Sequence, residues 1–320
     1  MTDPSGAFDG RRAVVTGASG FIGRWVVRAL AERGAHVLAV GRDRVAVETA
    51  LRDARGQIEI IESDLELMTP GWITPLAPDV VFNLAGYGVD RTERDETTAW
   101  RINHYVVQAL AIETSTLGGD WPHARLVHTG SALEYGMTAG DLREDSPASP
   151  TTLYGKTKLG ATRELARLGQ TSGLRAIVAR LFTVYGPGEH AGRLLPTILA
   201  AARHNEPIPL TDGTQRRDFA YVEDVVEGLL RLAVSDAAPG EVVNLASGVM
   251  QSVRTFVERA ADAAGIDRDR LQFGALPTRP EEMEHSGVSV AKLQRLTGWT
   301  PSADIVAGVR RTIYHLGVRG

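Results

Sequence analysis

The sequence predicts an α/β protein in which a doubly wound parallel sheet is joined by a smaller C-terminal α/β lobe. Short, continuously apolar runs at residues 13–15, 37–40, 58–61 and 80–84 alternate with longer segments of helical periodicity. Continuous apolar strands are typical of sheets covered by helices on both faces, and strand–helix alternation favours parallel pairing. A glycine-rich turn between the first strand and the first helix supports the same architecture.

The alternation of strands and helices continues to about residue 180. Residues 21–33 have the periodicity of a helix, and a long helix is expected from about 92 to 116. Further strands are expected at 125–128 and 176–179. The segment between these two strands carries Tyr154 and is expected to be helical.

The chain is expected to divide into a tail, a sheet domain and a smaller lobe. The sheet domain takes residues 11–182 and 219–247. The smaller lobe takes 183–218 and 248–320, where glycine, proline and arginine interrupt the regular pattern. Residues 1–10 are expected to form a flexible tail. No repeat or low-complexity linker separates the two lobes, so we expect them to fold as one unit.

The composition excludes several classes of function. The chain is 43% hydrophobic and 23% charged with a formal net charge of −4, which offers no electrostatic footprint for nucleic acid or an anionic membrane. It has no cysteine, so disulfides, thiolate catalysis and zinc–sulfur sites are excluded, and its 8 histidines show no metal-ligand spacing. No signal-like run or membrane-spanning apolar segment is present, and we expect a soluble, cytoplasmic protein without a metal.

The glycine-rich turn runs from Thr16 to Gly23, with glycines at 17, 20 and 23. Its place between a strand and a helix makes it a dinucleotide-binding pattern of the Rossmann type. The turn needs residues without Cβ, the backbone must approach the pyrophosphate closely, and the helix N-terminus offers donors to an anion. A tight turn without a ligand is the alternative interpretation.

The end of the second strand bears on the choice between NAD and NADP. An acidic residue there usually binds the ribose 2′-hydroxyl of NAD, but this chain has Gly41 and Arg42. A glycine removes repulsion of a 2′-phosphate and an arginine suits it, so NADP(H) is favoured over NAD(H). Asp43 leaves NAD open, because a shift of one residue would place it on the ribose. Asp64, after the third strand, is a candidate for the adenine amine or, alternatively, a helix N-cap.

Tyr154 and Lys158 are four residues apart on the expected helix, so their side chains lie on one face. A nearby cation favours the phenolate and is expected to lower the pKa of Tyr154. Tyr154 is therefore a candidate general acid or base for proton transfer to or from a carbonyl or hydroxyl group. An exposed polar helix face is the alternative reading of the same spacing.

Further motifs follow in a characteristic order along the chain. They are Asn83-Leu84-Ala85-Gly86, Asn103, residues 129–136 (TGSALEYG), 180–188 (RLFTVYGPG), 212–219 (DGTQRRDF), 243–248 (VNLASG) and 296–301 (LTGWTP). With the glycine turn and the Tyr154/Lys158 pair, they resemble the extended short-chain dehydrogenase/reductase family over residues 12 to 315. This family includes sugar-nucleotide epimerases, dehydratases and reductases that bind NAD(P) in a Rossmann-type domain.

The resemblance implies roles for residues at matched positions. Ser131 would hydrogen-bond the reacting oxygen, Tyr154 would be the acid or base, and Lys158 would lower its pKa and hold the nicotinamide ribose. The implied cofactor-binding residues are Gly17, Ser19, Gly20, Phe21, Ile22, Gly23, Arg42, Asp64, Leu65, Leu84, Ala85 and Lys158. The implied substrate-binding residues are Tyr87, Ser131, Thr183, Arg193, Arg217 and Arg279. Arg217 and Arg279 match arginines that grip the diphosphate of a nucleotide sugar.

Departures from the family pattern narrow the reaction. The 4,6-dehydratases carry an Asp-Glu pair where this chain has Ala132 and Leu133, and the sugar-acid decarboxylases use a glutamate at the place of Leu133. Neither side chain can transfer a proton, so dehydration and decarboxylation are not expected. Glu134 lies one position late for either role. Thr183 replaces an asparagine that many relatives use on the substrate phosphates.

Two main functions remain. The favoured one is NADPH-dependent reduction of a keto group, most often C4, on a nucleotide-linked deoxysugar, and the alternative is an NAD(P)-dependent 4-epimerase. Reduction of a non-nucleotide carbonyl and a non-enzymatic NADP-binding regulator are lesser alternatives. The resemblance also implies a homodimer that pairs helices 92–116 and 151–171. Val106, Val107, Leu110 and Leu159 are candidate contacts, and core packing explains them equally well.

Overall fold

The computed structural model describes residues 4–68, 71–89, 92–138, 140–202, 206–277 and 286–317. Its central sheet has seven strands in the order β3-β2-β1-β4-β5-β7-β11, and all neighbouring pairs are parallel. The strands are β1 (Arg12–Thr16), β2 (His36–Gly41), β3 (Gln57–Glu62), β4 (Val80–Asn83), β5 (Leu126–Ser131), β7 (Ala176–Leu181) and β11 (Glu241–Leu245). This architecture confirms the predicted doubly wound fold of the Rossmann type.

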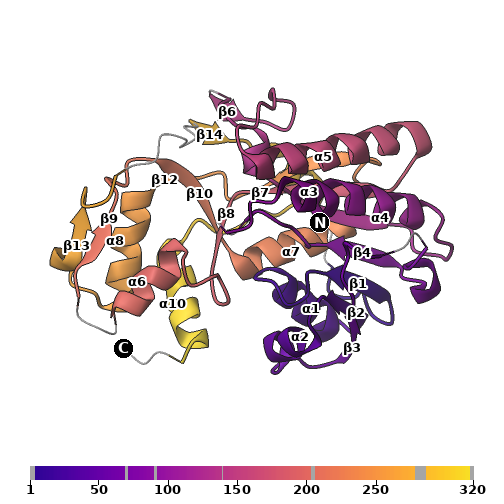
Figure 1. Cartoon of the computed structure of the whole chain (residues 1–320), viewed down its shortest axis with the longest axis horizontal. Coiled ribbons are helices and arrows are strands. Elements are labelled where there is room, and N and C mark those ends of the chain that lie inside the picture. The colour runs from indigo at the N-terminus through magenta and orange to yellow at the C-terminus, as the bar shows by residue number, and fades with distance from the viewer. Residues whose placement is uncertain are drawn as a thin grey trace.

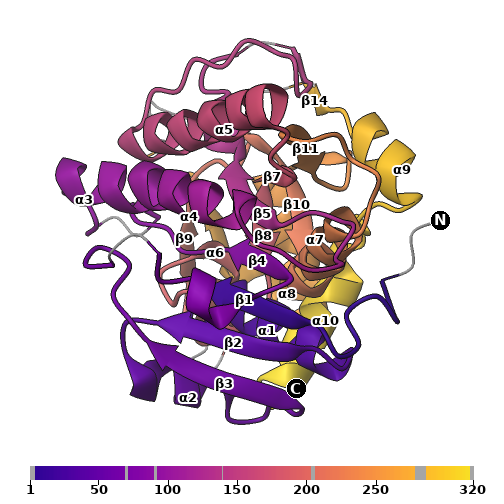
Figure 2. The same cartoon turned by 90° about the vertical axis from the view of Figure 1, so that its right-hand side faces the viewer.

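Helices cover both faces of the sheet (Figures 1 and 2). One face carries α1 (Gly23–Glu32), α2 (Arg44–Leu51) and α7 (Val222–Ala233), and the other carries α3 (Glu96–Trp100), α4 (Val106–Ser115) and α5 (Leu153–Ser172). Successive strand residues alternate between the two layers: Val14 packs with the α4/α5 cluster, and Val15 packs with the α1/α7 cluster. The strands read as continuous apolar runs because both faces are buried.

The smaller elements gather beside the carboxyl ends of the strands (Figure 1). They form sheets β12-β10-β8, β13-β9 and β14-β6, with helices α6, α8 and α10, whereas α9 packs on α7 and β11. Their bounds are β6 (Asp141–Leu142), β8 (Thr183–Tyr185), β9 (Ile208–Leu210), β10 (Arg216–Tyr221), β12 (Met250–Ser252), β13 (Leu271–Phe273), β14 (Gly287–Val288), α6 (Leu194–Ala202), α8 (Val253–Ala264), α9 (Ala291–Thr297) and α10 (Ile305–His315), with short 3₁₀ turns η1 (Thr74–Leu76), η3 (Ala132–Glu134) and η4 (Arg268–Arg270).

The segment 219–247 belongs only in part to the central sheet. Residues 219–221 lie in β10, which pairs with β8 and β12 in a separate small sheet, whereas α7 and β11 return to the large one. A single cluster of buried residues runs from Val15 in β1 to Val309 in α10. Most elements of the smaller lobe therefore share a continuous core with the sheet, whereas β6, β12 and β14 contribute to a separate cluster around Tyr135. No helix in the described ranges is long and apolar enough to cross a membrane.

The expectation of a flexible tail over residues 1–10 is wrong for its second half. Phe8 is fully buried, and its ring lies 6.3 Å from that of Phe82 and 5.8 Å from that of Trp121, centroid to centroid. Gly10 also donates a backbone hydrogen bond to the carbonyl of Gly34. One aromatic side chain in a polar segment anchors the segment against β4, and the local composition does not show this.

The helix expected at 92–116 begins at Glu96, where Asp95 caps it by accepting from the Thr98 amide at 2.7 Å. A π-helical turn, η2 (Arg101–Tyr105), separates α3 from α4. The wider turn places Asn103 inward and fully buried. Turns of this kind often occur at functional sites, and Asn103 contacts the site described below.

Phe8→Ala is expected to reduce the free energy of unfolding by about 3–5 kcal/mol, because the change leaves a cavity against β4. Chemical denaturation monitored by circular dichroism measures this. Leu67→Ala is the control, since Leu67 is 78% exposed and its truncation should cost less than about 0.5 kcal/mol. A tail without structural importance would give the two variants equal stability.

Candidate active site

The glycine-rich loop follows β1 and has the compact form that its sequence predicts. Gly17 has φ of +68°, and a Cβ there would lie 2.9 Å from the Ala85 amide nitrogen. A Cβ on Gly23 would overlap the Gly17 carbonyl oxygen. The Gly20 amide donates to that same oxygen at 2.9 Å. The absence of Cβ atoms therefore brings the start of α1 against the loop, which is the cradle that a dinucleotide pyrophosphate needs.

Buried polar groups connect this loop to the one after β4. The Thr16 hydroxyl donates to Asn83 Oδ1 at 2.6 Å and accepts from the Ala85 amide at 3.3 Å. Leu84 and Ala85 thus lie directly beside Gly17. The strand order of the sheet reverses between β1 and β4, and this is where nucleotides bind in doubly wound folds.

The two charged residues after β2, Arg42 and Asp43, have different surroundings in the structure. Asp43 is the N-cap of α2, and its Oδ1 accepts from the Ala46 amide at 3.0 Å. Arg42 is exposed and makes no hydrogen bond or ion pair in the described part of the chain. Gly41 is buried, where a Cβ would lie 2.5 Å from Val47. The aspartate that left NAD open therefore has a structural function, and the arginine is available to a ligand.

The residues proposed for the adenine lie after β3. Asp64 is half-buried and its Oδ1 accepts from the Glu66 amide at 2.9 Å, so it caps a turn, and Leu65 is buried. The residues of the loop, Ser19, Phe21 and Ile22, are half-buried or lie at its surface. Together with the glycine cradle and Arg42, these positions fit an NAD(P) dinucleotide along the carboxyl edge of the sheet.

The Tyr154/Lys158 pair lies at the start of α5, which Thr152 caps by accepting from the Gly155 amide at 3.1 Å. Lys158 is buried, and its Nζ donates to the Thr129 carbonyl at 3.0 Å and lies 5.8 Å from the centroid of the Tyr154 ring. Ser131 ends β5 and caps the turn η3. The structure thus brings the end of β5 and the first turns of α5 together, as the motif positions predict.

The expected direction of the Tyr154 pKa is wrong in this structure. Burial, followed by the negative charge of Glu134, raises the pKa of the phenol above its usual value. Burial also lowers the pKa of Lys158 to about 8, while Glu134 acts to raise it. Desolvation outweighs the cation–phenol attraction because both side chains have left water. At neutral pH, Tyr154 is therefore a neutral hydrogen-bond donor.

Asn103 holds the loop after β4 against α5. Its side-chain amide donates to the Tyr87 carbonyl at 2.7 Å and to the Thr157 hydroxyl at 2.9 Å, and its oxygen accepts from the Tyr87 amide at 2.9 Å. Gly88 then packs against Tyr154, with a Cβ position 3.5 Å from the tyrosine ring. Tyr87 is half-buried beside this site and packs against the apolar cluster of the α4/α5 layer, so its place in a substrate pocket stays a prediction.

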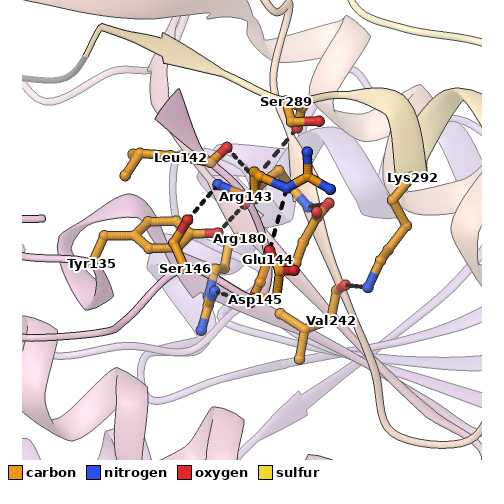
Figure 3. Close-up of polar contacts among 11 residues, drawn as sticks. Tyr135, Leu142, Arg143, Glu144, Asp145, Ser146, Arg180, Val242, Ser289 and Lys292 are labelled. Carbon is orange, nitrogen blue, oxygen red and sulfur yellow. Dashed lines mark hydrogen bonds and ion pairs between the residues drawn. The ribbon is translucent and has the colours of Figure 1, made fainter. Parts of the chain in front are cut away.

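A buried polar network lies next to the Ser131 turn, and Figure 3 shows the part of it around Tyr135, Glu144 and Arg180. Glu134 is fully buried and accepts from Arg180 Nε at 2.8 Å. Arg180 also lies over the Tyr135 ring, 4.5 Å from its centroid, and the Tyr135 hydroxyl donates to Asn244 Oδ1 at 2.6 Å. The backbone amide of Asn244 in turn donates to Glu144 Oε1 at 3.0 Å. The network joins β5, β7 and β11 to the segment that leads into α5.

Sequence reasoning placed no role on Glu134, Arg180, Glu144 or Asn244. The available signal was that Glu134, Arg180 and Asn244 lie in family motifs and that charged residues in apolar strands need buried partners, whereas Glu144 lies outside the motifs. The identity of those partners depends on the fold and could not be deduced from the motifs.

Besides Ser131 and Tyr87, four residues were predicted to bind substrate, and they lie on different segments of the smaller lobe. Arg193 is half-exposed just before α6, its Nε lies 3.5 Å from Glu189 Oε1, and its charge opposes the rise in the pKa of Tyr154. Thr183 begins β8 and Arg217 lies in β10, where its Nη1 donates to the Arg216 carbonyl at 2.9 Å. Arg279 lies outside the described residues.

Glu189 is a further buried carboxyl group that was not predicted from the sequence. Its side chain is only 7% exposed, and within the described ranges its Oε2 has no hydrogen-bond partner. Burial raises the pKa of this carboxyl to about 7. The preceding residues are fixed to the start of α1, since Trp25 Nε1 donates to the Pro187 carbonyl at 2.9 Å.

The apolar residues considered as dimer contacts lie largely in the core. Val107, Leu110 and Leu159 are buried within the protomer. Tyr105 and Ile112 are instead exposed on the same helical segment, at 58% and 57%. The homodimer stays a prediction, and any pairing through this face would use Tyr105 and Ile112.

A protein-family model described as the NAD dependent epimerase/dehydratase family matches residues 13–246. The chain belongs to this family and is an enzyme of its NAD(P)-dependent class, which confirms the resemblance to extended short-chain dehydrogenases/reductases. It is 30% identical over 313 residues to dTDP-6-deoxy-L-talose 4-dehydrogenase (NAD(P)(+)) of Kitasatospora kifunensis, covering 93% of each chain.

Two further matches agree with this assignment. GDP-6-deoxy-D-mannose reductase of Pseudomonas aeruginosa is 29% identical over 313 residues, covering 94% of this chain and 95% of the relative. Among solved structures, MoeE5 in complex with UDP-glucose and NAD matches with a TM-score of 0.80 and 29% identity, covering 96% of this chain and 98% of that chain.

Gly23→Ala is expected to weaken dinucleotide binding at least tenfold and to destabilise the protein by about 1–3 kcal/mol, because the new methyl overlaps the Gly17 carbonyl. Cofactor titration by fluorescence and thermal unfolding measure the two effects. Gly118→Ala is the control, since a Cβ there meets nothing within 4 Å. Equal cofactor affinity in both variants would contradict the assignment of the loop.

Proposed function

We propose that the protein reduces a keto group, at C4, of a nucleotide-linked deoxysugar with NADPH. The observation that carries the proposal is the end of β2, where Arg42 is exposed without a partner among the described residues while Asp43 is engaged as the cap of α2. An arginine suits a ribose 2′-phosphate, and an NADP-linked reductase draws on the cellular pool of reductant. An epimerase, the alternative function, would not need the cellular pool of NADPH.

The residues at the end of β5 support reduction over other reactions of the family. Ala132 and Leu133 stand where dehydratases need acid and base, and neither side chain can move a proton. The names of two relatives, a 6-deoxy-L-talose 4-dehydrogenase and a 6-deoxy-D-mannose reductase, also concern redox chemistry on 6-deoxysugars. We assign a nucleotide 4-keto-6-deoxysugar as the substrate class.

In this proposal the glycine loop would hold a nicotinamide cofactor, which would supply a hydride to the carbonyl carbon. Tyr154 donates its phenolic proton to the carbonyl oxygen, and the Ser131 hydroxyl donates a hydrogen bond to the same oxygen as negative charge develops. Burial keeps Tyr154 protonated at neutral pH, which is the form that an acid needs. Lys158 holds the nicotinamide ribose and provides a positive charge beside the phenol.

The remaining roles concern binding. The glycine loop, Leu84, Ala85, Asp64 and Leu65 hold the cofactor, with Arg42 on its 2′-phosphate. Arg193, Arg217 and Arg279 are assigned to the substrate diphosphate, and Tyr87 and Thr183 to the sugar pocket. Guanidinium groups suit this task because they bind phosphate oxygens in a bidentate manner.

The purified protein is expected to oxidise NADPH stoichiometrically with a panel of dTDP- and GDP-linked 4-keto-6-deoxysugars, followed by absorbance. Tyr154→Phe should lower kcat by about 10²–10⁴-fold, because the proton donor is lost. Tyr314→Phe is the control, since Tyr314 is 89% exposed in α10 and has no role in the proposed site. Interconversion of ordinary nucleotide sugars without added reductant would instead establish the epimerase.

Arg42→Ala is expected to raise KM for NADPH by about 10- to 100-fold, the value of a charge-assisted hydrogen bond, and to leave KM for NADH nearly unchanged. Steady-state kinetics with each cofactor measures the ratio. Arg44→Ala is the matched control, because Arg44 is engaged by the Ile60 carbonyl at 3.0 Å. Equal changes for both cofactors in Arg42→Ala would show that Arg42 does not read the 2′-phosphate.

A further inference from the structure

Glu134 is a fully buried carboxylate with a partner on each oxygen. Its Oε1 accepts from the Ser131 amide at 2.8 Å, and its Oε2 accepts from Arg180 Nε at 2.8 Å. Ser131 and Glu134 together form a capping box on η3. With both oxygens engaged by donors, Glu134 is poorly placed to transfer a proton to a substrate.

The turn that contains Glu134, η3, packs directly against the first turn of α5, which carries Tyr154. A Cβ on Gly155, the residue after Tyr154, would overlap the Leu133 carbonyl oxygen, so the first turn of α5 rests on η3. A Cβ on Gly130 would lie 2.5 Å from Glu134 Oε1. Close packing on both sides fixes the carboxylate between β5, β7 and α5.

The charge of Glu134 acts on both Tyr154 and Lys158. The other charged groups that influence Tyr154 are Arg193 and Glu93, and the neutral ring of His128 also faces Lys158. Glu134 favours the protonated form of each member of the pair. Its partner Arg180 is turned toward Tyr135, where it stacks on the ring.

We propose that Glu134 is a positioning residue of the catalytic centre, which fixes the Ser131 backbone with one oxygen and supplies a buried negative charge that stabilises the cationic form of Lys158. Lys158 needs this charge because burial disfavours its ammonium form. The buried place of Glu134 between β5, β7 and α5 and its effect on the Lys158 pKa do not depend on the reaction that the protein catalyses. Its consequence for turnover rests on the proposed reductase function.

The chain offers a direct test, since its only lysines are Lys156, Lys158 and Lys292. Each Cε resonance of the full chain labelled with ¹³C-lysine can be titrated by NMR, and Lys158→Arg identifies the Lys158 signal. Glu134 raises the pKa of Lys158, so Glu134→Gln should move the Lys158 midpoint from about 8 to lower pH, by roughly half a unit or more.

Glu144→Gln is the matched control. Glu144 belongs to the same network, accepting from the Asn244 amide, but its charge does not act on Lys158 or Tyr154. The titration midpoint of Lys158 in Glu144→Gln should equal the midpoint in the wild type. An unchanged midpoint in Glu134→Gln, or an equal shift in both variants, would overturn the proposal.

Glu134→Gln leaves Arg180 without a counter-charge and can impair folding for that reason. The double variant Glu134→Gln/Arg180→Gln removes both charges and retains a hydrogen-bonding pair. It should show the same downward shift of Lys158. A double variant that folds and titrates like the wild type would mean that Glu134 acts only as a cap.

Turnover provides the second readout. An acid must be protonated, so the reduction rate falls as pH rises through the pKa of the catalytic pair, and Glu134→Gln should move this fall to lower pH. A protein that reduces no keto sugar would contradict the proposed function while leaving the lysine titration able to support or reject the role of Glu134.

Discussion

All seven strands of the central sheet are parallel, and this constraint places every part of the candidate site at one edge. The glycine loop follows β1, Arg42 follows β2, Ser131 ends β5, and Asn244 lies near the end of β11. Residues far apart in the chain, such as Tyr135 and Asn244, thereby meet without any local signal of their proximity. The direction of the strands, more than any single contact, makes one continuous site from separate motifs.

Polar groups at this edge are buried, and their hydrogen bonds determine which loops can lie side by side. Asn83 illustrates the principle, because its side chain accepts from Thr16 and contacts His128 Nδ1 at 3.0 Å. A buried amide that lost either partner would be left unsatisfied, at a cost of about 1–3 kcal/mol. The loops after β1, β4 and β5 are therefore held in one arrangement by groups that do no chemistry themselves.

The sequence predicted those features that depend on local pattern. Strands with continuous apolar runs, the glycine loop and the start of the Tyr154 helix were found near their expected positions, because strand burial, positive φ and helix capping leave local signatures. The burial of Phe8, the π-helical turn around Asn103 and the separate sheet of β10 were not predicted. Each of these depends on a partner from a distant part of the chain, and a local pattern carries no record of that partner.

The same distinction explains the error in the direction of the Tyr154 pKa. The spacing of Tyr154 and Lys158 indicates a cation near a phenol, but it gives no measure of how much water both groups lose. In the structure, desolvation favours the neutral phenol and the neutral amine together, so burial alone would produce an uncharged pair. A buried anion changes this balance, because it opposes deprotonation of either group. Glu134 supplies that anion beside the serine it also positions, so the charge of the lysine depends on this carboxylate, whereas burial already keeps the tyrosine in its acid form.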